Sequence, residues 1–146
     1  MARKQWSAQA AAKWSRSRLR ALGRTRAKYP HPLAWRLRQA LERIREVQVI
    51  GYDWPVPGDT PRAMFCKAWL RLPDGREAGI DCIWPSGLAR MSKHDRALVV
   101  EKREWLEAHG HPYMRFDNLK TTTLEIEIAV RYWIRTLRAS APRSER

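Results

Sequence analysis

The stretch AMFCKAWLRLPDGREAGIDCIWP, residues 63–85, decides the fold of this 146-residue chain. On both sides of its central Pro-Asp-Gly, small or apolar residues alternate with polar or larger ones, which is the pattern of two strands joined by a tight turn. A three-residue loop with Gly75 in the left-handed conformation places Leu72 opposite Arg76. The sequence therefore predicts a β-hairpin with a defined register.

That register brings two pairs of opposite charges together on one face of the hairpin. Lys67 lies opposite Asp81, and Arg71 lies opposite Glu77. Such cross-strand pairs stabilise the register that creates them, so the charges support the turn assignment. We expect both pairs to form ion pairs.

The same register places Cys66 opposite Cys82 on the apolar face of the hairpin. No other cysteine is present, and the histidines do not complete a zinc-ligand spacing with these two. We expect two buried free thiols that are neighbours in the core, in a chain of the reducing cytoplasm.

Periodicity predicts five further elements around the hairpin. They are a helix over 32–46, a strand over 47–54, a helix over 92–109 that opens on a capping box at Ser92, a strand over 111–116 and a last helix capped by 121–123. The predicted fold is α/β of the mixed α+β kind, with a three-stranded meander and one further strand flanked by helices. Its order is α-β-β-β-α-β-α. The body spans 32–139, and a polar tail covers 140–146.

The positive charge is concentrated before this body. Residues 1–45 hold 13 Lys and Arg against one acid, Glu42, whereas residues 46–146 hold 16 against 14. Residues 1–31 therefore form a basic arm and linker, with a predicted helix over 4–22. The cations expected to bind phosphates are Lys13, Arg16, Arg18, Arg20, Arg24, Arg26 and Lys28.

Such an asymmetric charge favours a polyanion as partner, with nucleic acid ahead of an anionic membrane surface. No apolar run is long enough to span a bilayer. On the hairpin, Trp69 shares a face with Lys67 and Arg71, and this face is a candidate surface for nucleic acid or for the arm. A protein partner is a further expectation.

The order of elements resembles the core of the PD-(D/E)XK nucleases and, more loosely, the N-terminal catalytic domain of TnsA-type transposon endonucleases. The segments that carry the resemblance are VQVIGYDWPVP, AMFCKAWLRLPDGREAGIDCIWP and ALVVEKREWLEAHGHPYMRF, over about 100 residues. It implies a fold that handles DNA in a phage or mobile element.

The catalytic motif of that family is not matched. Its members place Asp near the start of the second core strand and Glu-x-Lys on the third, where they hold a divalent metal. Here the second strand has no acid, and Ile83 stands two residues after Asp81. A migrated site with Mg²⁺ would draw on Glu42, Glu77, Asp81 and Lys67.

Three functions follow from these observations. The first is a non-enzymatic nucleic-acid-binding protein, for DNA in preference to RNA, on a nuclease-like fold without its metal site and with no cofactor. The second is a metal-dependent endonuclease with an atypical site. The third is a ribosome- or RNA-associated basic protein.

Overall fold

The computed structural model describes residues 32–82 and 92–140. Its elements are α2 (Pro32–Glu42), β1 (Gln48–Pro55), β2 (Phe65–Arg71), β3 (Glu77–Cys82), α3 (Lys93–Ala108), β4 (Tyr113–Phe116) and α4 (Thr123–Ser140). The predicted α/β class and the α-β-β-β-α-β-α order are confirmed. The basic arm with its seven named cations lies outside the described residues, as do residues 141–146 of the predicted tail.

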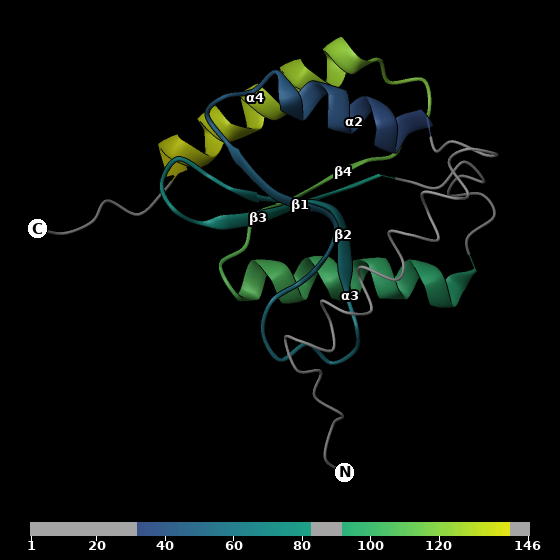
Figure 1. The fold of residues 1–146 in the computed structure, drawn as a ribbon. Helices are drawn as coiled ribbons and strands as arrows, with labels where there is room; N and C mark the ends of the chain where they lie inside the picture. The colour runs from purple at the N-terminus through teal and green to yellow at the C-terminus, as the bar shows by residue number, and fades with distance from the viewer. Residues whose placement is uncertain (1–31, 83–91, 141–146) are drawn as a thin grey trace, which may run out of the picture.

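The four strands form one mixed sheet in the order β1-β2-β3-β4. Strands β1, β2 and β3 are antiparallel neighbours, and β4 joins the edge parallel to β3 after the crossover through α3. Helices α2 and α4 cover one face of the sheet, and α3 lies across the other (Figure 1). The body is therefore a three-layer arrangement with a buried sheet.

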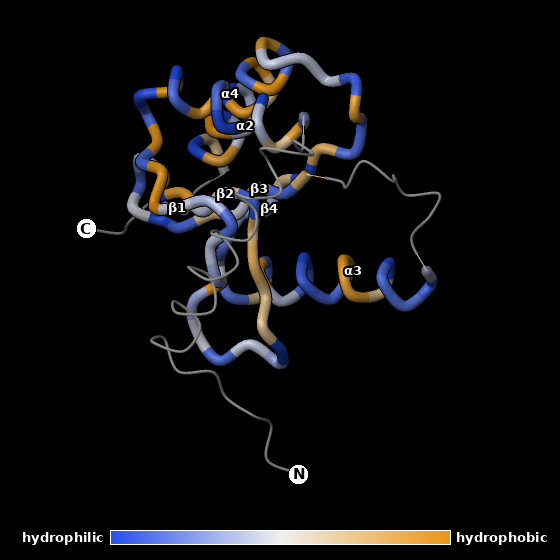
Figure 2. The backbone as a smooth tube through the Cα atoms, turned by 45° about the vertical axis from the view of Figure 1, so that its right-hand side comes forward, coloured by the Kyte–Doolittle hydropathy of each residue, from blue (hydrophilic) through white to orange (hydrophobic). Residues whose placement is uncertain are grey.

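Each face of the sheet has its own hydrophobic core. The larger core lies under α2 and α4 and contains Leu37, Leu70 and Ile126. The smaller one lies under α3 and is built around Trp69 and Leu106, both fully buried. Hydrophobic and hydrophilic segments alternate along the helices, as expected for helices that bury one side (Figure 2).

The hairpin has the predicted register. Leu72 N donates to Arg76 O at 2.8 Å, and Gly75 adopts the left-handed conformation with φ 91°. The paired positions run from Arg71 opposite Glu77 to Ala68 opposite Ile80. Glycine reaches this φ without the clash that a Cβ would cause, so the Pro-Asp-Gly turn sets the pairing of both strands.

The helix ends also follow the sequence, with one correction. Ser92 caps α3 by accepting from Asp95 N at 3.0 Å, and Thr122 with Glu125 forms a capping box that opens α4. Helix α2, expected to continue to residue 46, ends at Glu42. Its last turn tightens, with Arg43 N and Ile44 N bonded three residues back, and this bends the chain into β1.

The prediction that Cys66 and Cys82 are core neighbours was wrong. Cys66 packs in the core under α3, and Cys82 packs in the core under α2 and α4. The regular β2–β3 pairing stops at Ala68, and Lys67 N donates to the Asp81 side chain at 2.9 Å instead of to a backbone carbonyl. Because β2 leaves β3 there, Cys66 turns to the other face. Both thiols are free and buried, as expected.

Gly79 offers a test of this turned cysteine. A Cβ at Gly79 would lie 2.6 Å from Cys66 Sγ and 3.2 Å from a ring carbon of Trp69. We expect Gly79→Ala to lower the free energy of unfolding by about 1–3 kcal/mol, because the core under α3 has no room for a methyl group. Urea denaturation monitored by tryptophan fluorescence measures this effect.

The cysteines supply matched backgrounds for the same experiment. In a Cys66→Ala protein, part of the cost of Gly79→Ala should disappear, because the clashing sulfur is gone. In a Cys82→Ala protein the cost should be unchanged, since Cys82 belongs to the other core. Equal relief in both backgrounds would contradict the placement of the two thiols.

Candidate functional site

Charged residues of alternating sign cross the sheet at one level. Asp53 of β1, Lys67 of β2, Asp81 of β3 and Arg115 of β4 occupy laterally adjacent positions in the four strands. Asp53 and Asp81 are 5% and 8% exposed, so the row is largely buried. Buried charges are stable only when they are paired, and each acid of this charged row has a lysine partner.

Asp81 is the centre of this charged row. Its Oδ1 accepts from Lys67 N at 2.9 Å, and its Oδ2 accepts from Lys102 Nζ at 2.6 Å and from Tyr113 Oη at 2.7 Å. Lys102 comes from α3 and also donates to Phe65 O of β2. One carboxylate thus connects β2, β3, β4 and α3.

These contacts shift the pKa values in opposite directions. Burial disfavours the charged carboxylate of Asp81, but the Lys102 ammonium and the three hydrogen bonds outweigh it and lower its pKa. For Lys102, burial disfavours the ammonium, and the charge of Asp81 outweighs this and raises its pKa. Burial and the Asp81 charge raise the pKa of Tyr113. At neutral pH the site is therefore a carboxylate, an ammonium and a neutral phenol.

Burial likewise raises the pKa of both cysteines, that of Cys82 to about 12. The negative charge of Asp81 adds to the effect in each case. A thiol is a nucleophile only as thiolate, so neither cysteine is activated.

The two cross-strand ion pairs predicted from the hairpin register do not form. Lys67 Nζ lies 3.1 Å from Asp53 Oδ1, while Asp81 pairs with Lys102. Glu77 accepts from Trp69 Nε1 at 3.2 Å instead of pairing with Arg71. The register is right, but Lys67, Asp81 and Glu77 lie on the side of the sheet that α3 covers, where other partners reach them, while Arg71 stays on the surface.

The hairpin surface proposed for nucleic acid also requires correction. Trp69 is fully buried under α3 and has no face on which a base could stack. The side chain of Lys67 is 12% exposed and is held by Asp53. Arg71 alone of these three remains on the surface. The prediction failed because it did not include α3 as the cover of this face of the sheet.

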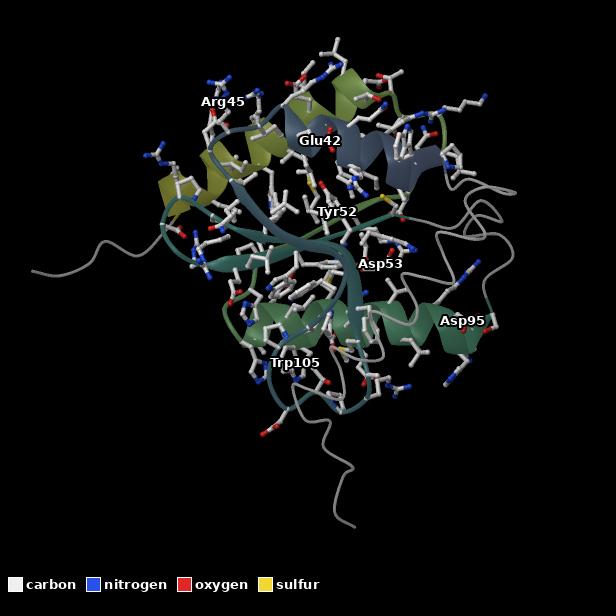
Figure 3. All side chains as sticks on the ribbon, viewed as in Figure 1. Glu42, Arg45, Tyr52, Asp53, Asp95 and Trp105 are labelled. Carbon is white, nitrogen blue, oxygen red and sulfur yellow. The ribbon has the colours of Figure 1, made fainter. Side chains whose placement is uncertain are left out.

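The four residues considered for a migrated nuclease site are not brought together. Glu42 lies at the end of α2, on the opposite side of the sheet from Trp105 of α3, and pairs with Arg38 (Figure 3). Glu77 is bound to the Trp69 indole, Lys67 to Asp53 and Asp81 to Lys102. Within residues 32–82 and 92–140, no group of three or more His, Cys, Asp or Glu side chains could hold a metal ion.

Asp53, Lys102 and Tyr113 were not identified from the sequence as parts of this site. Lys102 follows Glu101 on a helix whose charges are typical of a solvated face. The available signal was position: Lys102 stands one helical turn before Leu106, the fully buried side chain of α3, so the two share the inward face of the helix.

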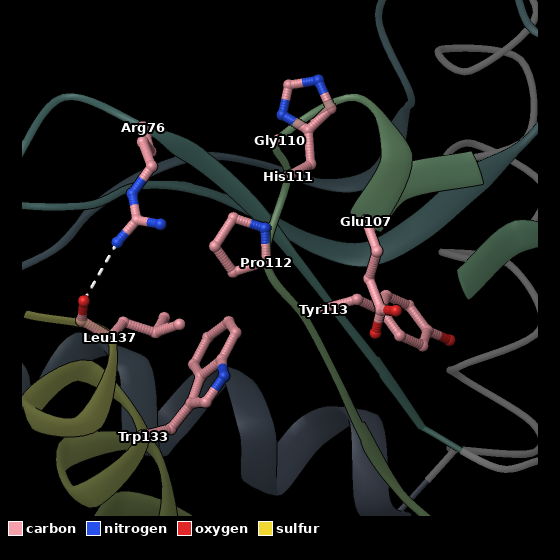
Figure 4. Close-up of a pocket in the computed structure, with 8 residues that line it drawn as sticks. All are labelled: Arg76, Glu107, Gly110, His111, Pro112, Tyr113, Trp133 and Leu137. Carbon is pink, nitrogen blue, oxygen red and sulfur yellow. Dashed lines mark hydrogen bonds between the residues drawn. The ribbon is translucent and has the colours of Figure 1, made fainter. Parts of the chain in front are cut away.

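A separate hollow of about 330 Å³ lies beside the edge strand β4 (Figure 4). Pro112, Trp133 and Leu137 supply apolar wall, and Arg76 stands at its side with its guanidinium bonded to Leu137 O at 3.2 Å. Among the residues that line it, the hollow brings no activated nucleophile and no carboxylate pair together. It therefore does not indicate a reaction.

No described helix has the length and apolar character to cross a membrane. Comparisons with models of protein families, with curated proteins and with solved structures found no match for the chain.

Replacing Lys102 tests the role of the charged row. In Lys102→Met the Asp81 carboxylate stays buried without its cation, so we expect the free energy of unfolding at pH 7 to fall by about 3–5 kcal/mol. In the wild-type protein, folding lowers the pKa of Asp81. The stability that Asp81 contributes is therefore complete above its pKa in the unfolded state, and it declines as the pH falls through its pKa in the folded state.

In Lys102→Met the remaining burial raises the pKa of Asp81, and the carboxyl becomes neutral on mild acidification. In urea titrations, the loss in free energy of unfolding relative to wild type should therefore be smaller at pH 5 than at pH 7. Arg62→Met is the matched control, because the Arg62–Glu101 pair is exposed and contributes at most about 1 kcal/mol. A deficit that does not change with pH would show that altered packing, not the buried charge, is responsible.

Proposed function

We propose that this protein binds nucleic acid without cleaving it, and that it prefers DNA to RNA. The observation that carries the proposal is the charge of residues 1–45, where 13 cations stand against one acid. Residues 1–31 hold nine of these cations and no acid, so the arm has no carboxylate of its own to relieve the repulsion. A phosphate backbone neutralises such a segment and releases counterions. The arm is the main contact, and Arg71 is an additional cation on the body.

The arrangement at Asp81 supports binding over cleavage. A metal-dependent nuclease needs carboxylate oxygens open to a divalent cation beside the scissile phosphate. Asp81 instead accepts hydrogen bonds from three donors, and the ammonium of Lys102 stands where a metal ion would otherwise neutralise the carboxylate. With Glu42 and Glu77 engaged elsewhere, the second candidate, an atypical endonuclease, has no observation among the described residues in its favour.

The biological setting is part of the same proposal. The α-β-β-β-α-β-α order is the one that resembles nucleases of mobile DNA, so we assign the protein to a phage or mobile element. The proposed location is the reducing cytoplasm, where proteins with free cysteines are common.

The arm should govern the salt dependence of binding. We expect replacement of Arg16, Arg18, Arg20, Arg24 and Arg26 by glutamine to weaken binding to duplex DNA. The slope of log affinity against log salt should fall by about 0.9 for each phosphate that the arm no longer neutralises. Fluorescence anisotropy between 50 and 200 mM NaCl measures it. The same five positions changed to lysine keep the charge and should keep most of the slope.

An unchanged slope in the glutamine protein would remove the arm from the binding site. The same titration with single-stranded DNA and with structured RNA tests the nucleic-acid class. Tighter binding to the RNA than to the duplex, at equal salt, would favour an RNA-associated protein.

The protein should leave supercoiled plasmid intact in Mg²⁺ or Mn²⁺. Cleavage would have to depend on Asp81, since it is the buried carboxylate of the strand on which the nuclease pattern places its acid. Agarose gels of plasmid incubated with wild type or with Asp81→Asn, which keeps the size of the side chain, measure this cleavage. Nicking by the wild type that disappears in the variant would restore the endonuclease hypothesis.

A further inference from the structure

Arginines gather at one end of the folded body. This end consists of the turn between α2 and β1, the tip of the β2–β3 hairpin and the second half of α4, and we call it the arginine end. Arg131 Nη2 donates to Arg43 O at 3.0 Å, Gln48 is the partner of Arg71, and Arg76 bonds Leu137 O. These contacts show that the three segments are neighbours, and Arg45 lies beside α4 (Figure 3).

The arginine end carries more positive charge than its acids neutralise. Arg76 is paired with Asp74, and Arg131 with Glu46 and Glu127. Five other arginines are exposed and form no ion pair with any described residue. They are Arg43, Arg45, Arg71, Arg135 and Arg138.

Three arginines of α4 surround a small hollow. It measures about 130 Å³ and is lined by Arg131, Arg135 and Arg138, with Ile134 as its apolar wall and Glu46 opposite. Positions 131, 135 and 138 lie on one face of the helix, so the three residues line the same hollow. Glu46 and Glu127 fix Arg131, whereas no carboxylate of the described chain holds Arg135 or Arg138 away from an incoming anion.

A favourable interaction with a helix dipole accounts for two of these arginines. Arg138 lies in the last turn of α4, and Arg43 lies in the tightened turn that ends α2, so both are at the negative end of a helix dipole. Arg45, Arg71 and Arg135 lie outside the last turn of any described helix. Close cations without acids repel one another, and planar guanidinium forks suit phosphate oxygens.

We propose that the arginine end is a second phosphate-binding surface, which contacts the phosphodiester backbone of a nucleic acid. The inference rests on the proposed function and locates a contact on the body that the basic arm does not supply. The described chain begins at Pro32 at one end of α2, whereas Arg43 and Arg45 follow its other end. The 11 residues of α2 span about 16 Å at 1.5 Å per residue, so the arginine end lies away from the point where the described chain begins.

The test uses the full chain and a fluorescent 20-base-pair duplex at 50 to 200 mM NaCl. The test variant combines Arg45→Gln with Arg135→Gln. The control combines Lys93→Gln with Lys120→Gln, which removes the same net charge from exposed cations at the start of α3 and before α4. Because none of the four forms an ion pair with a described residue, neither variant should have a lower thermal unfolding temperature than the wild type.

The salt slope should fall by about 1.8 in the test variant, or about 0.9 for each of two phosphates no longer neutralised, and by less than one in the control. Equal slopes in the two variants would overturn the arginine end while the arm variant still tests the proposed function. A wild type that binds no nucleic acid would overturn both. Weaker binding of the test variant to anionic lipid vesicles, with DNA binding intact, would also overturn this assignment.

Discussion

The carboxylate of Asp81 is the contact on which the rest of the fold depends. It takes the place of a backbone partner for Lys67 N at the point where β2 leaves β3, and it binds Lys102 of α3 and Tyr113 of β4. A strand that separates from its neighbour exposes N–H and C=O groups, and burying them without partners costs stability. Asp81 satisfies the N–H, and Lys102 satisfies Phe65 O. The charged row therefore closes a gap in the sheet.

This role explains why α3 is polar and still covers a core. Its fully buried side chain is Leu106, and beside it Lys102 enters the core as a charge that meets an opposite charge. Burying such a pair is favourable only when its remaining hydrogen bonds are made, which is the case here. The same arrangement uses the oxygens that a metal would need, so stability and metal binding compete for one carboxylate.

The lysines in the interior of the body and the arginines at its arginine end differ in whether they have a carboxylate partner. Inside, Lys67 and Lys102 each lie within 3.1 Å of a carboxylate oxygen. At the arginine end, Arg45, Arg135 and Arg138 have no such partner among the described residues. Internal charges must be compensated by the protein itself, whereas surface charges are available to an external anion. This contrast separates the charges that hold the fold from those that support the proposed function.

Local patterns in the sequence determined the elements, the hairpin register and the helix caps. Each of these depends on residues a few positions apart, such as Gly75 in its turn or Ser92 with Asp95, so the chain itself holds the information. Only the tertiary structure decided that Trp69 is buried, that Cys66 faces the core under α3 and that Asp81 pairs with Lys102 instead of Lys67. The physical reason is that α3 packs on the second face of the sheet and brings a cation to Asp81 from 21 residues away. The alternation of residues along the hairpin contains no information about which helix packs on it.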